Sequence, residues 1–188
     1  MEPIIQQLIL SDTDHLIRAC SNVDLDFERT PKKIGMSYLA GFLDGDGSIV
    51  AQIVERSDYV LKYQLRVSVS FTQKTRRKHF LLQIQKELGG KGCVRERPDG
   101  VSEFAIVGQN DVGWFLRQIA PMLHLKKKQA YLVLKIIEQL PLTKNSPEKF
   151  LDLCTLADHV SELNDSKNRQ CTTQVVRERF QDLKGIKE

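Results

Sequence analysis

The sequence predicts an α+β domain built on a four-stranded antiparallel sheet. One segment alternates strictly between apolar and polar residues, and a helical segment followed by a pair of strands occurs twice along the chain. Helical segments then fill the C-terminal part. The chain has 188 residues, of which 41% are hydrophobic and 28% charged, so it is long and apolar enough to bury one core. This composition excludes a disordered tail, a collagen and a coiled coil.

Residues 1–35 stand apart from the predicted domain, which covers 36–188. They combine an apolar patch at helical spacing with the acidic stretch 24–28, and their net charge is −2. We expect an N-terminal extension that is helical or partly disordered and that does not lie on DNA. Three roles stay open for it: covering an apolar surface, extending a binding footprint, or none, because Met36 directly precedes the domain.

The first half of the domain starts with a short helix over residues 37–44, which Gly45 and Gly47 end. A strand is predicted over 49–56 and a second over 59–72. In the second strand the odd positions are apolar and the even positions from 62 onward are polar. Such alternation predicts one packed face and one solvated face. The solvated face is rich in hydrogen-bonding side chains.

The second half repeats this pattern without repeating the sequence. A helix is predicted over 75–88, followed by strands over 92–97 and 101–107 that form a hairpin across Pro98-Asp99-Gly100. Further helices are predicted over 111–119 and 128–140. Ser146 followed by Pro147 predicts the start of a helix that reaches residue 163. A last helix is predicted over 172–183.

Positive charge is concentrated in one part of the chain. Residues 62–97 carry a net charge of +8, whereas the rest carries −4. This favours a polyanion such as nucleic acid as partner, and the alternative is a solvated basic face. No apolar run is long enough to cross a bilayer, and no signal or transit peptide is recognisable. The four cysteines are far apart, which is typical of free thiols in a reducing compartment.

The most informative segment is residues 38–47, Tyr-Leu-Ala-Gly-Phe-Leu-Asp-Gly-Asp-Gly. It resembles the signature of the LAGLIDADG homing endonucleases. Further matches follow in order at Thr72-Gln73-Lys74, at the lysine-rich turn 125–130 and at 163–167. The resemblance covers residues 37–180 and is greatest to the homodimeric type encoded by introns in chloroplast large-subunit ribosomal RNA genes of green algae. It implies the αββαββ fold, with a saddle-shaped sheet and C-terminal helices.

One copy of the signature implies a homodimer, because the family pairs two signature helices. Small residues let two helices approach closely, while Phe42 and Leu43 face the core of each subunit. The residues expected at the dimer interface are Leu39, Ala40, Gly41, Asp44 and Gly45. For Asp44 we favour the simpler interpretation of a structural cap or turn carboxylate.

The resemblance assigns a metal site to the end of the signature helix. Pairing the helices brings Asp46 of the two chains together, and two close carboxylates need cations to remain charged. Oxygen ligands and phosphate favour Mg²⁺, with Mn²⁺ as an expected substitute. By resemblance Asp46 is the metal ligand and the backbone carbonyl of Gly45 lies beside it.

The resemblance also names three further catalytic residues. Gln73 corresponds to a residue that positions the hydrolytic water, and an amide orients water without acting as a strong base. Lys126 corresponds to the basic residue that approaches the scissile phosphate. Arg77 corresponds to a second basic residue in the solvent network. The alternative for Lys126 is a solvated lysine at a helix start, where the helix dipole disfavours cations.

Side chains on the solvated face of the sheet are expected to contact bases in the major groove. The expected base contacts are Gln52, Arg56, Gln64, Arg66, Ser68, Ser70, Arg95 and Arg97. In the C-terminal loop, Lys167 and Arg169 are expected near backbone phosphates.

The resemblance implies a Mg²⁺-dependent endonuclease that cuts both strands of a long pseudo-palindromic site in an intronless ribosomal RNA gene. It also implies short 3′ overhangs, promotion of intron homing, and encoding in the chloroplast. Two alternatives remain: an RNA-binding splicing cofactor (maturase), and a DNA-binding protein that does not cleave. The joint presence of Asp46, Gln73 and Lys126 favours the enzyme.

Overall fold

The computed structural model separates into two units, residues 1–32 and 33–188. It describes residues 33–144, 146–164 and 169–185, so the predicted N-terminal extension lies outside the described residues except for 33–35. The described elements are α2 (Met36–Asp46), β1 (Gly47–Glu55), β2 (Tyr63–Lys74), α3 (Lys78–Glu87), β3 (Cys93–Glu96), β4 (Val101–Val107), α4 (Gln109–Ile119), α5 (Lys127–Gln139), α6 (Pro147–Glu162) and α7 (Thr173–Gly185), with short 3₁₀ turns at Thr75–Arg77, Ala120–Met122 and Leu140–Thr143.

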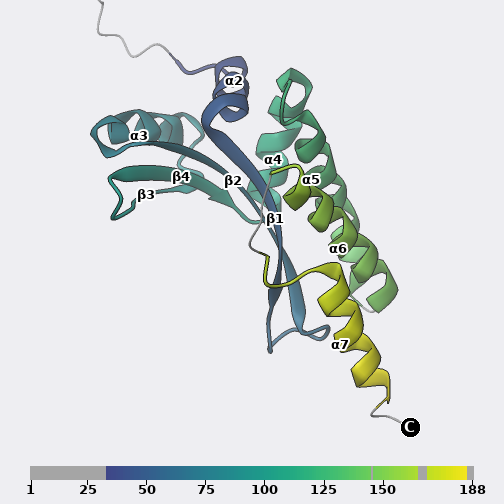
Figure 1. Cartoon of the computed structure of the whole chain (residues 1–188). Coiled ribbons are helices and arrows are strands. Elements are labelled where there is room, and N and C mark those ends of the chain that lie inside the picture. Colours follow the sequence, from purple (N-terminus) through teal and green to yellow (C-terminus); the bar gives the residue numbers. More distant parts are fainter. Residues whose placement is uncertain (1–32, 145, 165–168, 186–188) are drawn as a thin grey trace, which may run out of the picture. The chain divides into compact units, whose positions relative to one another are not determined.

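The four strands form one sheet in the order β1-β2-β4-β3, and every neighbouring pair is antiparallel. This confirms the predicted fold class. β2 and β4 occupy the centre, and β1 and β3 form the edges. Figure 1 shows α4, α5 and α6 gathered on one side of the sheet, with the opposite side uncovered around β1 and β2. We call the uncovered side the open face.

The alternation in β2 is confirmed. Tyr63, Leu65, Val67, Val69 and Phe71 are all buried, while the residues between them are half-buried or exposed. The same alternation runs through β1, because its register places the buried odd positions of the two strands opposite one another. The packed face therefore supplies a continuous apolar layer, which the helices cover.

The second strand begins later than predicted. Residues 56–62 form the turn between β1 and β2, and β2 starts at Tyr63 instead of residue 59. Lys62 adopts φ +59°, and the backbone N–H of Arg56 donates to its carbonyl over 2.7 Å. The apolar residues of the turn continued the alternation by coincidence. Val60, in the middle of this turn, is 85% exposed.

The helix boundaries agree with the sequence to within about two residues, apart from the 3₁₀ turn that precedes α3. The Ser146 hydroxyl accepts from the backbone N–H of Lys149 at the start of α6, so the predicted N-cap is confirmed. α2 lies at one end of the sheet, where β1 begins directly at Gly47. A Cβ on Gly47 would lie 2.3 Å from the Leu43 side chain, which explains why the helix passes into the strand at a glycine.

Candidate functional site

Two aspartates at the end of α2 have opposite environments. Residues two apart on an α-helix point about 200° apart, so Asp44 and Asp46 face different sides of it. Asp44 is 9% exposed and faces the body of the domain. Asp46 is exposed at the last position of the helix, where β1 begins. The helix geometry therefore turns one carboxylate into the fold and the other out of it.

The exposed Asp46 belongs to a short chain of hydrogen bonds with residues from the end of β2. The Gln73 amide Nε2 donates to Asp46 Oδ2 over 3.3 Å, and Arg77 donates to Gln73 Oε1 over 3.3 Å. The Thr72 hydroxyl donates to the Asp46 carbonyl over 3.3 Å. Three of the four predicted catalytic residues thus lie in one network, within a hollow that these residues line together with Lys74 and Arg76.

Lys126, the fourth predicted catalytic residue, reaches the same helix end from the opposite side. Its Nζ donates to the backbone carbonyl of Asp44 over 2.6 Å. Carbonyls in the last turn of a helix lack helical partners and carry partial negative charge, so a cation is favourable there. The unfavourable dipole at the start of α5 is thereby compensated by the favourable one at the end of α2.

The Asp44 carboxylate binds the backbone of the segment that contains Lys126. The Asp44 carboxylate accepts from the backbone N–H of His124 over 2.7 Å and of Lys126 over 2.9 Å. Burial alone would raise the pKa of Asp44, but the backbone amides of residues 124, 126 and 125 hold that pKa below its usual value. The interpretation of Asp44 as a structural carboxylate agrees with this geometry.

Predicted base-contacting side chains share the open face. Gln52 of β1 lies opposite Arg66 of β2, and Ser48 lies opposite Ser70. Gln64, Ser68 and Ser70 are half-buried, while Gln52 and Arg66 are exposed. Arg66 Nε donates to Gln64 Oε1 over 3.2 Å, so these two neighbours are oriented together. The open face is therefore lined with donors and acceptors that do not point into the core.

A family model described as "LAGLIDADG endonuclease" matches residues 39–157. The chain belongs to the LAGLIDADG endonuclease family. The chain is 51% identical over 140 residues to DNA endonuclease I-CreI of Chlamydomonas reinhardtii, which spans 74% of this chain and 85% of the relative. It is 48% identical over 151 residues to DNA endonuclease I-CvuI of Chlorella vulgaris, covering 80% and 92% respectively.

Solved LAGLIDADG endonucleases share the fold. The structure of I-CvuI in complex with an I-CreI target, in 2 mM Mg with the DNA not cleaved, matches with a TM-score of 0.74 and 48% identity, covering 79% of this chain and 93% of the other. I-CvuI with its own target in 2 mM Ca matches equally well. The archaeal endonuclease I-Vdi141I, complexed with DNA, matches with a TM-score of 0.66 at 22% identity over 75% and 91% of the two chains, which shows the fold alone.

Most residues predicted at the dimer interface of α2 are buried within the single chain. Leu39 and Ala40 are 1% exposed and pack into the core of their own chain. The buried Asp44 is bound to the backbone of residues 124 and 126. Gly41 and Gly45, one helical turn apart, are exposed, and a Cβ on either would meet nothing within 4 Å. Of the five residues expected at the interface, these two offer a free surface to a partner helix.

Several arginines predicted to contact DNA form salt bridges with acidic residues that were not predicted as part of the site. Glu103 on β4 lies opposite Arg95 of β3, and its Oε2 is 2.6 Å from Arg95 and 3.2 Å from Arg97. Burial alone would raise the pKa of Glu103, but the hydrogen bonds from both arginines hold it below its usual value. The short turn at 98–100 was the signal, because counting back from it places residues 95 and 103 opposite one another.

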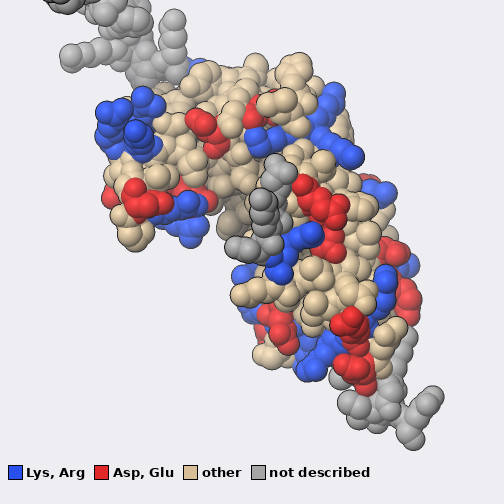
Figure 2. Space-filling view, viewed as in Figure 1, with Lys and Arg blue, Asp and Glu red and all other residues tan. Residues whose placement is uncertain are grey.

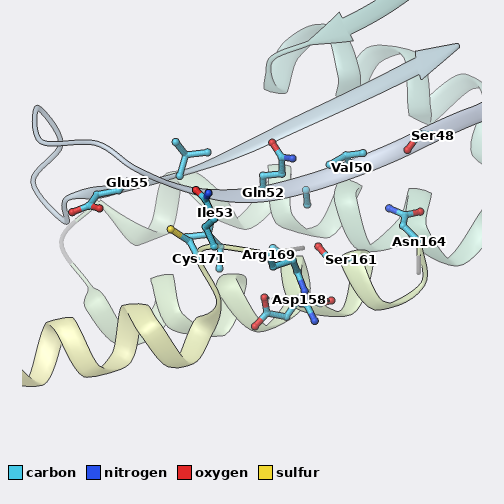
Figure 3. A pocket seen from close by; sticks show the side chains of 14 residues that line it. Ser48, Val50, Gln52, Ile53, Glu55, Asp158, Ser161, Asn164, Arg169 and Cys171 are labelled. Carbon is cyan, nitrogen blue, oxygen red and sulfur yellow. Dashed lines mark hydrogen bonds and ion pairs between the residues drawn. The ribbon is translucent and has the colours of Figure 1, made fainter. Parts of the chain in front are cut away.

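Arg56 and Arg169 have similar partners. Arg56 lies in the turn, not in the strand, where it pairs with Asp58 at 2.9 Å and lies over the Tyr59 ring. Figure 3 shows Arg169 directed toward Asp158 of α6, in a groove that α6 and the C-terminal loop form with β1. Their distance is 3.2 Å. Lys167 lies outside the described residues.

The donor set at the end of α2 suits a hard divalent cation. Asp46 supplies an exposed carboxylate, and no salt bridge to it occurs among the described residues. The Gly45 carbonyl belongs to the last helical turn, where carbonyls lack helical partners. The described part of one chain contains no group of three His, Cys, Asp or Glu side chains that would complete a site alone.

Positive surface charge lies close to Asp46 and Gln73. Figure 2 shows Lys and Arg side chains gathered over the end of the molecule where α3 lies, and mixed charges over α6 and α7. Arg76 and Arg77 precede α3, and Lys78 and Lys86 belong to it. The positive surface thus adjoins the Asp46 hollow. Within the described ranges, no helix has the length and apolar character needed to span a membrane.

Proposed function

We propose that this protein is a site-specific homing endonuclease that hydrolyses phosphodiester bonds in both strands of DNA, as a homodimer and with Mg²⁺. The observation that carries the proposal is the convergence at the end of α2. Asp46, Gln73 and Arg77 form one hydrogen-bonded chain, and the ammonium of Lys126 is held at the same helix end. The relatives named DNA endonucleases, at about half identity, support the same activity.

Gln73 has the role of orienting water. Its Nε2 donates to Asp46 and its Oε1 accepts from Arg77, so the amide plane is fixed from both ends. One amide hydrogen and one lone pair then remain to hold a water molecule beside the phosphodiester. Because an amide is a poor proton acceptor, the group positions the nucleophile and leaves proton removal to solvent.

Asp46 and the Gly45 carbonyl are the residues that would hold Mg²⁺, and Mn²⁺ would satisfy the same oxygen donors. The bound cation would act as a Lewis acid on the phosphate and lower the pKa of water. Lys126 adds a fixed positive charge where the transition state gains negative charge. Its ammonium has two further donors besides the one bound to Asp44.

A second copy of the chain completes the site. One chain contributes one exposed Asp46 and a helix face free of side chains at Gly41 and Gly45. Packing two such faces brings two α2 helices into close contact and places one Asp46 from each chain near the twofold axis. Two open faces then line up along a long, pseudo-palindromic DNA site.

Recognition of that site is assigned to the open face. Gln52 and Gln64 suit adenine, and Arg66, Arg95 and Arg97 suit guanine, as bidentate partners in the major groove. Ser68 and Ser70 supply adaptable hydroxyls. Arg56 and Arg169 would exchange Asp58 and Asp158 for DNA, because both arginines are paired with these acids in the free chain.

The proposed target is a ribosomal RNA gene that lacks its intron, cut to leave short 3′ overhangs. The proposed origin is the chloroplast genome, since the relatives at about 50% identity come from the green algae Chlamydomonas and Chlorella. Cleavage there would promote insertion of the intron that encodes the enzyme.

The test is cleavage of a plasmid carrying an intronless chloroplast large-subunit ribosomal RNA gene, in Mg²⁺, Ca²⁺ or EDTA. We expect one double-strand cut in Mg²⁺ and specific binding without cutting in Ca²⁺. Light scattering in the same buffers is expected to give twice the chain mass of 21.5 kDa. Specific binding with no cut in any metal would refute the endonuclease and leave a binding protein or maturase, to be sought on intron RNA.

A further inference from the structure

The buried Asp44 joins two segments that are about 80 residues apart in the sequence. Its two carboxylate oxygens accept from the backbone N–H groups of His124 and Lys126, and its own carbonyl accepts from the Lys126 ammonium. One residue at the end of α2 thus holds both the backbone and the side chain of Lys126. Two residues further along the helix, Asp46 makes its contacts with the end of β2.

None of these three bonds is a direct carboxylate–ammonium pair. The carboxylate of Asp44 is occupied by neutral backbone amides, and the ammonium of Lys126 by a neutral backbone carbonyl. The two charges still act on one another, because the Lys126 ammonium is among the groups that lower the pKa of Asp44. With the observed arrangement no carboxylate occupies the ammonium, and its remaining N–H groups are available to donate to an incoming phosphate.

We propose that Asp44 is a positioning residue for cleavage, which fixes Lys126 relative to Asp46. The inference rests on the proposed endonuclease function. Asp44 touches neither DNA nor metal in this proposal, and it acts only through the segment 123–126. A residue needed only for folding would lower stability and DNA binding along with the rate, whereas a positioning residue lowers the chemical step selectively.

The first experiment compares Asp44→Asn with the wild type. Asn keeps the shape but has one acceptor oxygen in place of two, so one of the two amides loses its partner. We expect the single-turnover rate in Mg²⁺ to fall about 10- to 100-fold, because small misplacements of catalytic groups have costs of this order. DNA affinity in Ca²⁺ should change less than about twofold. A fall in affinity as large as the fall in rate would overturn the proposal.

Two further variants sharpen the comparison. Asp44→Glu keeps both acceptor oxygens and is expected to restore part of the rate, whereas a rate no higher than that of Asp44→Asn would contradict the proposal. Asp111→Asn is the matched control, because Asp111 of α4 pairs with Lys91, which precedes β3, and belongs to no predicted site. Its rate and affinity should equal those of the wild type.

A double-mutant cycle then tests whether Asp44 acts through Lys126. In a Lys126→Ala background, Asp44→Asn should reduce the rate further by less than about twofold, since the group that it positions is already absent. Rate losses that multiply would show that Asp44 acts independently of Lys126 and would overturn the inference.

Amide hydrogen exchange provides a readout that needs no activity. In the wild type the amides of His124 and Lys126 should be protected, and Asp44→Asn should lose protection in the segment 123–126 while β2 stays protected. Unchanged exchange in this segment would refute the positioning role even if the wild type cuts DNA. A wild type that fails to cut, with protection lost as expected, would refute the proposed function and keep the structural link.

Discussion

Asp44 and Asp46 are the same residue type, two positions apart, but one is buried and the other exposed. The carboxylate of Asp44 is buried and accepts from two backbone amides, while the carboxylate of Asp46 is exposed and accepts from the Gln73 amide over 3.3 Å. The helical rotation between them explains the difference. Both acids belong to the motif. Their positions on the helix decide which one stabilises the fold and which one stays available for chemistry.

Asp46→Asn should have the largest effect on cleavage. Because Asp46 is exposed, the variant should keep the melting temperature of the wild type. Because Asp46 is the proposed metal ligand, single-turnover cleavage should fall at least about 1,000-fold, the upper end of the effect of removing one electrostatic group. Calorimetry and gel-resolved cleavage measure the two quantities. A large loss of stability would show that both aspartates are structural.

Lys126→Ala should have the next largest effect. It removes the positive charge at the end of α2 but leaves the backbone bond from residue 126 to Asp44 in place. We expect the cleavage rate to fall about 100-fold with the fold intact. Rapid-quench kinetics measures the rate, and circular dichroism provides the control. An unchanged rate would mean that the ammonium only caps the helix.

Glu103→Gln extends the comparison to a second buried acid. Like Asp44, Glu103 is buried and held by other groups, and its lowered pKa stabilises the folded state above the ordinary carboxyl value of 4.5. That stabilisation is lost as the pH falls through the lower pKa of the folded state. The variant should therefore be less stable than the wild type at pH 7, and the difference should shrink as the pH falls below 4.5, as measured by urea unfolding.

The same substitution should alter DNA discrimination. Without the negative charge, Arg95 and Arg97 lose the partner that orients them, and one more positive charge faces the DNA. We expect non-specific binding to become more salt-dependent by a slope of about one, and discrimination at the bases opposite these arginines to weaken by a few-fold. Titrations against specific and random duplexes at several salt concentrations measure this. An unchanged slope would show that Glu103 does not modulate the arginines.

The smallest expected effect concerns a buried and an exposed cysteine. Burial raises the pKa of the Cys154 thiol to about 12, and Cys93 is exposed on β3. Iodoacetamide should modify Cys93 in the folded protein and Cys154 only after unfolding. Peptide mass spectrometry of the protein labelled before and after unfolding checks this. Early labelling of Cys154 would contradict its burial.

Much of the fold follows from local sequence patterns. Alternation in β2, Gly47 at the end of α2 and the Ser146 cap are local signals, and the structure agrees with each. Gly45 was also predicted to end the helix, but α2 continues through it to Asp46. The start of β2 was misplaced because the apolar residues of the preceding turn continue the alternation. The strand order β1-β2-β4-β3 depends on long-range pairing, which periodicity does not encode.

The site was predictable where a motif marks it and unpredictable where partners are distant. Asp46, Gln73 and Lys126 were predicted by resemblance, and the structure brings them to one end of α2. The link from Asp44 to residues 124 and 126 spans 80 positions and leaves no trace in spacing. Glu103 was missed because its role depends on the register of β3 and β4, which the turn at 98–100 implies but which alternation within each strand does not show.

We expect Asp46, the exposed acid of α2, to bind the metal that drives DNA cleavage. The most direct measurement is the single-turnover cleavage rate over a range of Mg²⁺ concentrations, for the wild type and Asp46→Asn side by side. We expect a saturating Mg²⁺ dependence for the wild type and no cleavage by the variant at any concentration, with both proteins binding the DNA in Ca²⁺. Equal rates for the two proteins would contradict the claim.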